Sequence, residues 1–109
     1  RLGPMTAELT EQVLAIVAEA LANILHHAQA SEVTIEVDRG DTYLTVTITD
    51  NGIGFPMEVI ANSGRPGHFG IRGMEERAHA FGGWLRIDNS ADLGAQIVLG
   101  IPVGPRKLL

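Results

Sequence analysis

Four polar side chains near the start of the chain have a spacing that could bring them together. Glu19, Asn23 and His26 recur at intervals of four and three residues, and His27 follows directly. On a helix such residues form one stripe beside the apolar stripe. A carboxylate there could polarise a nucleophile, an amide oxygen could bind Mg²⁺, and an imidazole could lie near a phosphate. The alternative interpretation is an ordinary solvated helix face.

A second group of candidate residues is the hexapeptide from Asp50 to Phe55, which directly follows an alternating apolar segment. A carboxylate at the end of a strand can accept a hydrogen bond from an exocyclic amine such as that of adenine. Gly52 and Gly54 would let a planar base or a phosphate approach the backbone closely. The alternative is an aspartate that caps its own turn, which is common in Asp-Asn-Gly sequences.

A third candidate is the glycine-rich stretch from Gly67 to Met74, which leads into a helical pattern. The unpaired amides at the start of a helix favour an anion. The stretch matches neither the Walker phosphate loop nor the dinucleotide fingerprint. By itself it indicates no more than a flexible helix entry.

Hydrophobic periodicity indicates which elements position these residues. Apolar side chains from Leu9 to Leu25 recur every three or four residues, which is typical of a helix with one buried stripe. Later segments alternate between apolar and polar residues, which is typical of strands. The expected elements, in chain order, are a helix over 6–30, strands over 33–38 and 44–49 with a tight turn at 39–41, a helix over 71–81 that ends at Gly82-Gly83, and strands over 84–89 and 96–102.

This order of elements predicts an α+β fold. Strands that are joined by short turns pair antiparallel, and helices on one face of such a sheet give a two-layer α/β sandwich. We therefore expect a mixed, mostly antiparallel sheet covered on one face by helices. Periodicity is lost between Asp50 and Gly73, where six glycines occur, so this segment is predicted to be a long loop.

Composition limits the class of protein. With 109 residues, 45% of them hydrophobic and 19% charged, the chain fits one globular domain with a packed core. The net charge of −5 and the lack of a basic block argue against nucleic acid as a partner. No apolar run is long enough to span a membrane, and there are no cysteines, which is compatible with the cytoplasm. Because the first residue is Arg1 rather than Met, a fragment of a longer protein is expected.

Taken together, the three segments resemble, in order, the named boxes of the Bergerat-fold ATPases, the superfamily of gyrase, the heat-shock chaperone, histidine kinases and the mismatch-repair protein MutL. Glu19 to Asn23 with His27-Ala28 is similar to the N box, Asp50 to Phe55 to the first glycine box, and Gly70 to Ala78 to the second. The spacing resembles that of sensor histidine kinases with a short lid that pair with helix-turn-helix response regulators. The resemblance covers residues from about 8 to 102.

The resemblance implies a role for each matching residue. Glu19 would be the catalytic base or polariser, Asn23 the Mg²⁺ ligand, and Asp50 the acceptor for the adenine amine. Two positions depart from the family pattern: His26 stands where Lys or Arg is usual, and Gly94-Ala95 where Gly-Thr is frequent. The implied nucleotide-binding residues are Asn23, His26, His27, Asp50, Gly52, Gly54, Phe55, Gly70, Ile71, Arg72, Gly73 and Met74, with an ATP lid over about 56–69.

The implied function of residues 1–109 is that of a single ATP-binding catalytic domain. Within a longer histidine protein kinase it would bind Mg-ATP and donate the γ-phosphate to a histidine on a separate dimerisation and phosphotransfer domain, in partnership with a cognate response regulator. No histidine of the chain is followed by Asp or Glu, as the acceptor signature requires. The chain alone is therefore expected to bind nucleotide as a monomer without sustained autophosphorylation.

The resemblance also implies a cytoplasmic location without direct membrane contact, in a parent protein that could itself be membrane-anchored. Two alternatives stay open. One is an anti-sigma-factor serine kinase of the same fold, whose target is a partner protein. The other is a degenerate, non-catalytic interaction module that binds no nucleotide.

Overall fold

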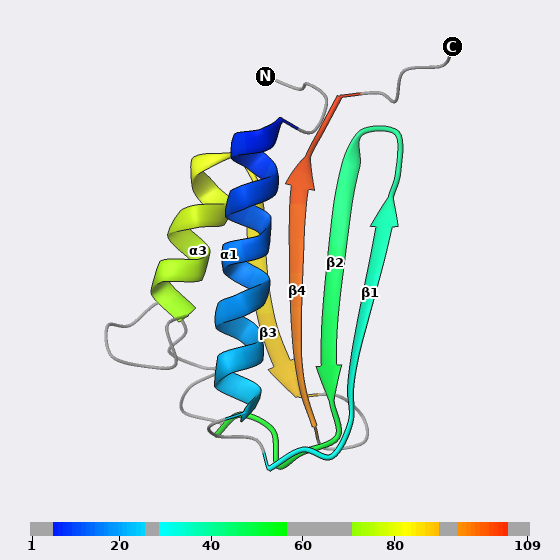
Figure 1. Cartoon of the computed structure of the whole chain (residues 1–109), viewed down its shortest axis with the longest axis vertical. Helices are drawn as coiled ribbons and strands as arrows, with labels where there is room; N and C mark the ends of the chain where they lie inside the picture. Colours follow the sequence, from blue (N-terminus) through cyan, green and yellow to red (C-terminus); the bar gives the residue numbers. More distant parts are fainter. Residues whose placement is uncertain (1–5, 26–28, 57–70, 90–93, 105–109) are drawn as a thin grey trace.

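The computed structural model describes residues 6–25, 29–56, 71–89 and 94–104. These residues form two layers, a four-stranded sheet and two helices that lie on one of its faces (Figure 1). The expected α+β sandwich is thereby confirmed. The expected lid over 56–69 lies outside the described residues except for Pro56. The elements are α1 (Ala7–Asn23), β1 (Val33–Arg39), β2 (Tyr43–Asp50), α3 (Ile71–Ala80), β3 (Trp84–Asn89) and β4 (Ala95–Pro102).

The strands follow the order β1-β2-β4-β3, and all three pairings between these strands are antiparallel. The parallel component of the expected mixed sheet is therefore not found among the described strands. The expected hairpin between β1 and β2 is confirmed, because Val33 pairs with Asp50, and the Gly40 amide donates to the Tyr43 carbonyl across the turn at 2.9 Å. This register fixes Asp50 at the last position of β2.

Helix α1 begins as the sequence predicts but ends earlier. Thr6 caps its N-terminus, where its side chain accepts a hydrogen bond from the Leu9 amide. The α-helix ends at Asn23, and Gln29 has a φ of 53°, so the expected continuation to Ala30 is wrong. Leu25, which belongs to the expected buried stripe, is 83% exposed. A left-handed residue such as Gln29 cannot be part of a right-handed helix.

Helix α3 ends as expected. The Gly82 amide donates to the His79 carbonyl and the Gly83 amide to the Ala78 carbonyl, both at 2.9 Å, and Gly82 has a φ of 75°. A left-handed glycine in this place is a common way to end a helix. On the outer face, Arg72 pairs with Glu76 at 3.2 Å, as the spacing of four residues suggests.

The core lies between the helices and three of the four strands. The buried residues of α1 and α3 pack against inward-facing residues of β2, β4 and β3. Strand β1 lies beyond the helices at the edge of the sheet, so its apolar residues Val33, Ile35 and Val37 stay exposed (Figure 1). None of the described helices is long and apolar enough to cross a bilayer.

One end of this sandwich gathers residues that lie far apart in the sequence. Helix α1 and strands β2 and β3 all finish there, while β4 begins there (Figure 1). Asn23, Asp50, Asn89 and Ala95 stand at these element ends. The fold thus brings two of the predicted site segments to the same edge.

Candidate functional site

Asp50 is the most deeply buried polar residue of this end, with 4% of its surface exposed. Its Oδ1 accepts hydrogen bonds from the amides of Gly52 at 2.7 Å and Ala95 at 3.3 Å. Its Oδ2 is buried and finds no hydrogen-bond partner among the described residues. The turn-capping interpretation therefore holds for Oδ1, and the binding of a ligand donor by Oδ2 stays a prediction. An exocyclic amine of a purine fits such an orphaned acceptor.

The loop after Asp50 depends on two glycines for its shape. Gly54 has a φ of 79°, a conformation that other residues rarely adopt. Gly94, at the start of β4, packs directly against the loop, because a Cβ added there would lie 1.7 Å from the Asp50 carbonyl oxygen. In the sequence Gly94 stands out only as part of a departure from the family pattern, and this packing role is not evident there. Ala95 contacts Asp50 through its backbone amide, which does not require the threonine usual in the family.

Asn51 fastens the same loop to the entry of β1. Its Oδ1 accepts hydrogen bonds from the amides of Ser31 and Glu32, at 2.9 and 3.0 Å, and its Nδ2 donates to Ser31 Oγ at 2.9 Å.

Phe55, the last residue of the candidate hexapeptide, is buried in the core, and its backbone is held by Asn89. The sequence reasoning did not single out Asn89. A polar residue at the end of an apolar strand was the only available signal.

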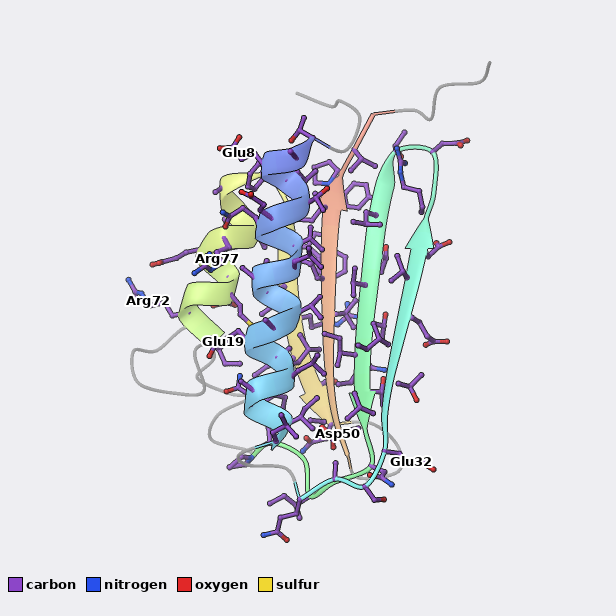
Figure 2. The ribbon with its side chains drawn as sticks, in the orientation of Figure 1. Glu8, Glu19, Glu32, Asp50, Arg72 and Arg77 are labelled. Atoms are coloured by element: carbon purple, nitrogen blue, oxygen red, sulfur yellow. The ribbon has the colours of Figure 1, made fainter. Side chains whose placement is uncertain are left out.

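The two predicted site residues of α1 that the structure describes lie in different surroundings. Asn23 is 8% exposed, and it lies at the end of α1 that is shared with Asp50. Glu19 is exposed, and Figure 2 shows it on the side of α1 that is nearer α3. His26 and His27 lie outside the described residues. Whether the four residues form one functional stripe thus stays a prediction.

Glu19 lines a cavity of about 160 Å³ together with Ala15, Gly73, Met74 and Arg77. The cavity lies between the middle of α1 and the first turns of α3. Gly73 is exposed, and a Cβ added there would meet no atom within 4 Å. A carboxylate therefore faces the N-terminal part of a helix across a small open space, and such a helix start favours an anion.

The other predicted residues of α3 contribute differently. Ile71 and Met74 are core residues with at most 1% of their surface exposed, so a nucleotide could contact them mainly through their backbones. Arg72 lies on the outer face, where it pairs with Glu76. Gly70 lies outside the described residues.

A metal ion at this site would need most of its ligands from the bound substrate and from water. Within the described ranges, no group of three His, Asp or Glu side chains could hold a metal ion. Mg²⁺ commonly uses one or two protein oxygens and takes its other ligands from substrate phosphates and water. The carbonyl oxygen of Asn23 fits that mode and does not require an acidic cluster.

Comparison with protein families gives one match over most of the chain. Residues 9–105 match the family described as histidine kinase-, DNA gyrase B- and HSP90-like ATPase. The chain is 32% identical over 97 residues to the sensor histidine kinase LiaS of Bacillus subtilis and 37% identical over 87 residues to the nitrate/nitrite sensor protein NarX of Escherichia coli. These alignments cover 89% and 80% of the chain, but only 26% of LiaS and 14% of NarX.

Solved structures share the fold. The ATP binding domain of PrrB from Mycobacterium tuberculosis superposes with a TM-score of 0.76 at 28% identity, over 90% of this chain and 71% of that chain. The catalytic domain of the histidine kinase ThkA superposes with a TM-score of 0.71 at 16% identity, a likeness of fold alone. The chain thus spans 71% of the PrrB domain structure but only 26% of LiaS and 14% of NarX.

Proposed function

The chain belongs to the histidine kinase-, DNA gyrase B- and HSP90-like ATPase family, as an ATP-binding catalytic domain of the sensor histidine kinase type, and from this membership we propose which of its residues hold Mg-ATP and what they do. The observation that carries the proposal is the orphaned Oδ2 of Asp50. This oxygen accepts a hydrogen bond from the exocyclic amine of adenine. The glycines at 52 and 54 let the flat base approach the backbone.

The phosphates then extend from the Asp50 end along α1 toward the first turns of α3. The Asn23 side-chain oxygen would hold Mg²⁺, and the ion would supply positive charge to neutralise the phosphates. Glu19 lies across the small cavity from Gly73, near the start of α3. In this place its carboxylate can hold the proton of an attacking imidazole while that nitrogen bonds to the γ-phosphorus and ADP leaves.

In the longer protein, the acceptor is a histidine on a separate dimerisation and phosphotransfer domain, and a cognate response regulator receives the phosphoryl group in turn. The names of LiaS and NarX as a sensor kinase and a sensor protein support this assignment. A nucleotide-free interaction module is less well supported, because a buried carboxylate oxygen without a donor is costly unless a ligand satisfies it.

The decisive experiment compares ATP with GTP, because GTP carries a carbonyl where ATP carries the amine. Calorimetric titration of the chain should give ATP an affinity at least tenfold higher than that of GTP in the presence of Mg²⁺. The Asp50→Asn variant should lose about 1–3 kcal/mol of ATP binding, the range for a hydrogen bond to a charged group. The same variant should reduce the difference between the ATP and GTP affinities, since the asparagine amide can donate to the guanine carbonyl.

Asp38→Asn is the matched control, because Asp38 is an exposed carboxylate on β1 far along the hairpin from Asp50. It should leave both affinities unchanged. Equal affinity of the parent chain for ATP and GTP, or no affinity for either, would refute the assignment of Asp50 as the base-binding residue.

A further inference from the structure

Asn89, the last residue of β3, holds the exit of the loop that starts at Asp50. Its Oδ1 accepts a hydrogen bond from the Phe55 amide at 2.7 Å, and its Nδ2 donates to the Phe55 carbonyl at 3.1 Å. One side-chain amide thus satisfies both backbone groups of a single residue. The pair joins positions 34 residues apart in the sequence.

The same end of the sheet also holds the entry of the loop. Asn89 pairs with Ala95 in the register of β3 and β4, and the Ala95 amide donates to Asp50 Oδ1. The loop from Asp50 to Phe55 is therefore tied at both ends to one rung of the β3–β4 ladder. Its first tie is made by a backbone amide and its second by the side chain of Asn89.

The second tie requires a side chain that both accepts and donates from two adjacent atoms. A carboxamide does so without a change of protonation state, and the asparagine side chain reaches both groups here. An aspartate would keep the acceptor for the Phe55 amide but would place a second acceptor against the Phe55 carbonyl. Alanine would leave both backbone groups of a buried residue unpaired by this contact.

We propose that Asn89 is a positioning residue of the nucleotide site, which fixes Gly52–Gly54 relative to Asp50 by holding Phe55 in place. The proposal rests on the function proposed above. Asn89 does not touch the nucleotide. It fixes the position of the loop on which the base lies. Without the Asn89 side chain, the loop shifts away from Asp50 Oδ2. The adenine base then cannot lie on the glycines and at the same time donate from its amine to the carboxylate.

The test compares Asn89→Ala with Gln96→Ala. Gln96 also carries a side-chain amide at this end of the sheet and donates to Thr49 Oγ1 at 3.4 Å. It neighbours Ala95 on β4, so its side chain points to the opposite face of the sheet. Removal of Gln96 therefore deletes an amide from the same end of the sheet without removing either tie of the loop.

Three quantities are measured for each variant: hydrogen exchange of the Phe55 amide in the free protein by NMR, the melting temperature, and the affinities for Mg-ATP and Mg-ADP. Asn89→Ala should speed hydrogen exchange of the Phe55 amide at least tenfold. It should also weaken the affinities for ATP and for ADP equally, each about tenfold. Equal factors are expected because both nucleotides share the base that the loop supports. Gln96→Ala should leave exchange and both affinities at the parent values.

The outcomes test the Asn89–Phe55 contact separately from the proposed function. Unchanged exchange at Phe55 in Asn89→Ala would show that Asn89 does not hold Phe55, whether or not nucleotide binds. Faster exchange with parent-like affinities would show that Asn89 supports the fold alone and would overturn the positioning role. A parent chain that binds no nucleotide overturns the proposed function, and the positioning role with it, while the exchange data still report on the contact itself.

A variant that does not fold is answered by Asn89→Asp, which keeps the acceptor for the Phe55 amide. This variant should keep exchange of the Phe55 amide close to that of the parent and still weaken ATP binding, because the donor to the Phe55 carbonyl is gone. ATP affinity equal to that of the parent in Asn89→Asp would contradict the proposal.

Discussion

The two ends of the proposed nucleotide site are built in different ways. At the base end, Asp50 is 4% exposed, its Oδ1 accepts two backbone amides, and Gly94 packs against its carbonyl. At the phosphate end, Glu19 and Gly73 are both exposed, and space is open around Gly73. Figure 2 shows Asp50 at the end of the sheet and Glu19 on the flank of α1. In the proposed site, the base end is thus formed by contacts within the fold itself, whereas the phosphate end is left open.

This difference separates specificity from chemistry. A base pocket whose acceptor is fixed in advance spends little binding free energy on ordering, so it can discriminate between bases. An open phosphate end suits a reaction in which a second domain must bring its acceptor side chain close to the γ-phosphate. Substitutions at the two ends should then differ in kind as well as in size.

The largest effect is expected at Gly94, on the base side. In Gly94→Ala the new Cβ would lie 1.7 Å from the Asp50 carbonyl oxygen, so the backbone of β2 or β4 must move. Overpacking of this kind costs about 1–3 kcal/mol or more, and we expect the upper end because both partners are backbone. Chemical denaturation should show this loss together with a loss of ATP binding. A variant with the stability and ATP affinity of the parent would show that the base end is not rigid.

A smaller effect is expected at Asn23, the proposed Mg²⁺ ligand at the end of α1. Asn23→Ala should reduce the dependence of ATP binding on Mg²⁺ more than binding itself, because the contacts of Asp50 with the base are untouched. Titration with Mg²⁺ and with a chelator measures the ratio of the two affinities, which should fall toward one. Gln12→Ala, another polar residue of α1, is the control and should keep the ratio of the parent. An unchanged ratio in Asn23→Ala, in a folded protein, would remove Asn23 from the metal site.

The smallest effect is expected at Gly73, on the phosphate side. A Cβ at this exposed helical position meets nothing within 4 Å, so Gly73→Ala should raise the free energy of unfolding by about 0.5–1 kcal/mol. Thermal unfolding measures the gain. A loss of stability would contradict the open surroundings of Gly73, whereas a gain that is accompanied by weaker ATP binding would place the phosphates against this residue.

The sequence predicted those features whose cause is local. The alternation over β1 and β2 gave their pairing, and the glycines after Phe81 gave the end of α3, because each signal lies within the element concerned. The end of α1 could not be found in this way. Leu25 continues the helical period although its side chain is exposed, and no glycine or proline follows to mark the end near Asn23.

The candidate site divides along the same line. Asp50 could be found from its own hexapeptide, and the spacing of Glu19 and Asn23 could be read on one helix. The contacts that tie the loop to the β3–β4 end of the sheet could not be found, because Ala95 lies 45 residues from Asp50 and Asn89 lies 34 residues from Phe55. The difference in burial between exposed Glu19 and buried Asn23 could not be found either. It depends on which neighbouring elements cover the helix, and the helical period does not contain that information.

The uncovered face of β1 has a consequence for the behaviour of these 109 residues at high concentration. An edge strand that exposes apolar side chains is a template for intermolecular sheet extension, and Val33, Ile35 and Val37 are 41%, 44% and 64% exposed. Exposed Glu36 and Asp38 alternate with them and, with the net charge of −5, make two such edges repel. Because salt shortens the range of this repulsion, colloidal stability should be greatest in dilute buffer, with these two carboxylates as gatekeepers against aggregation.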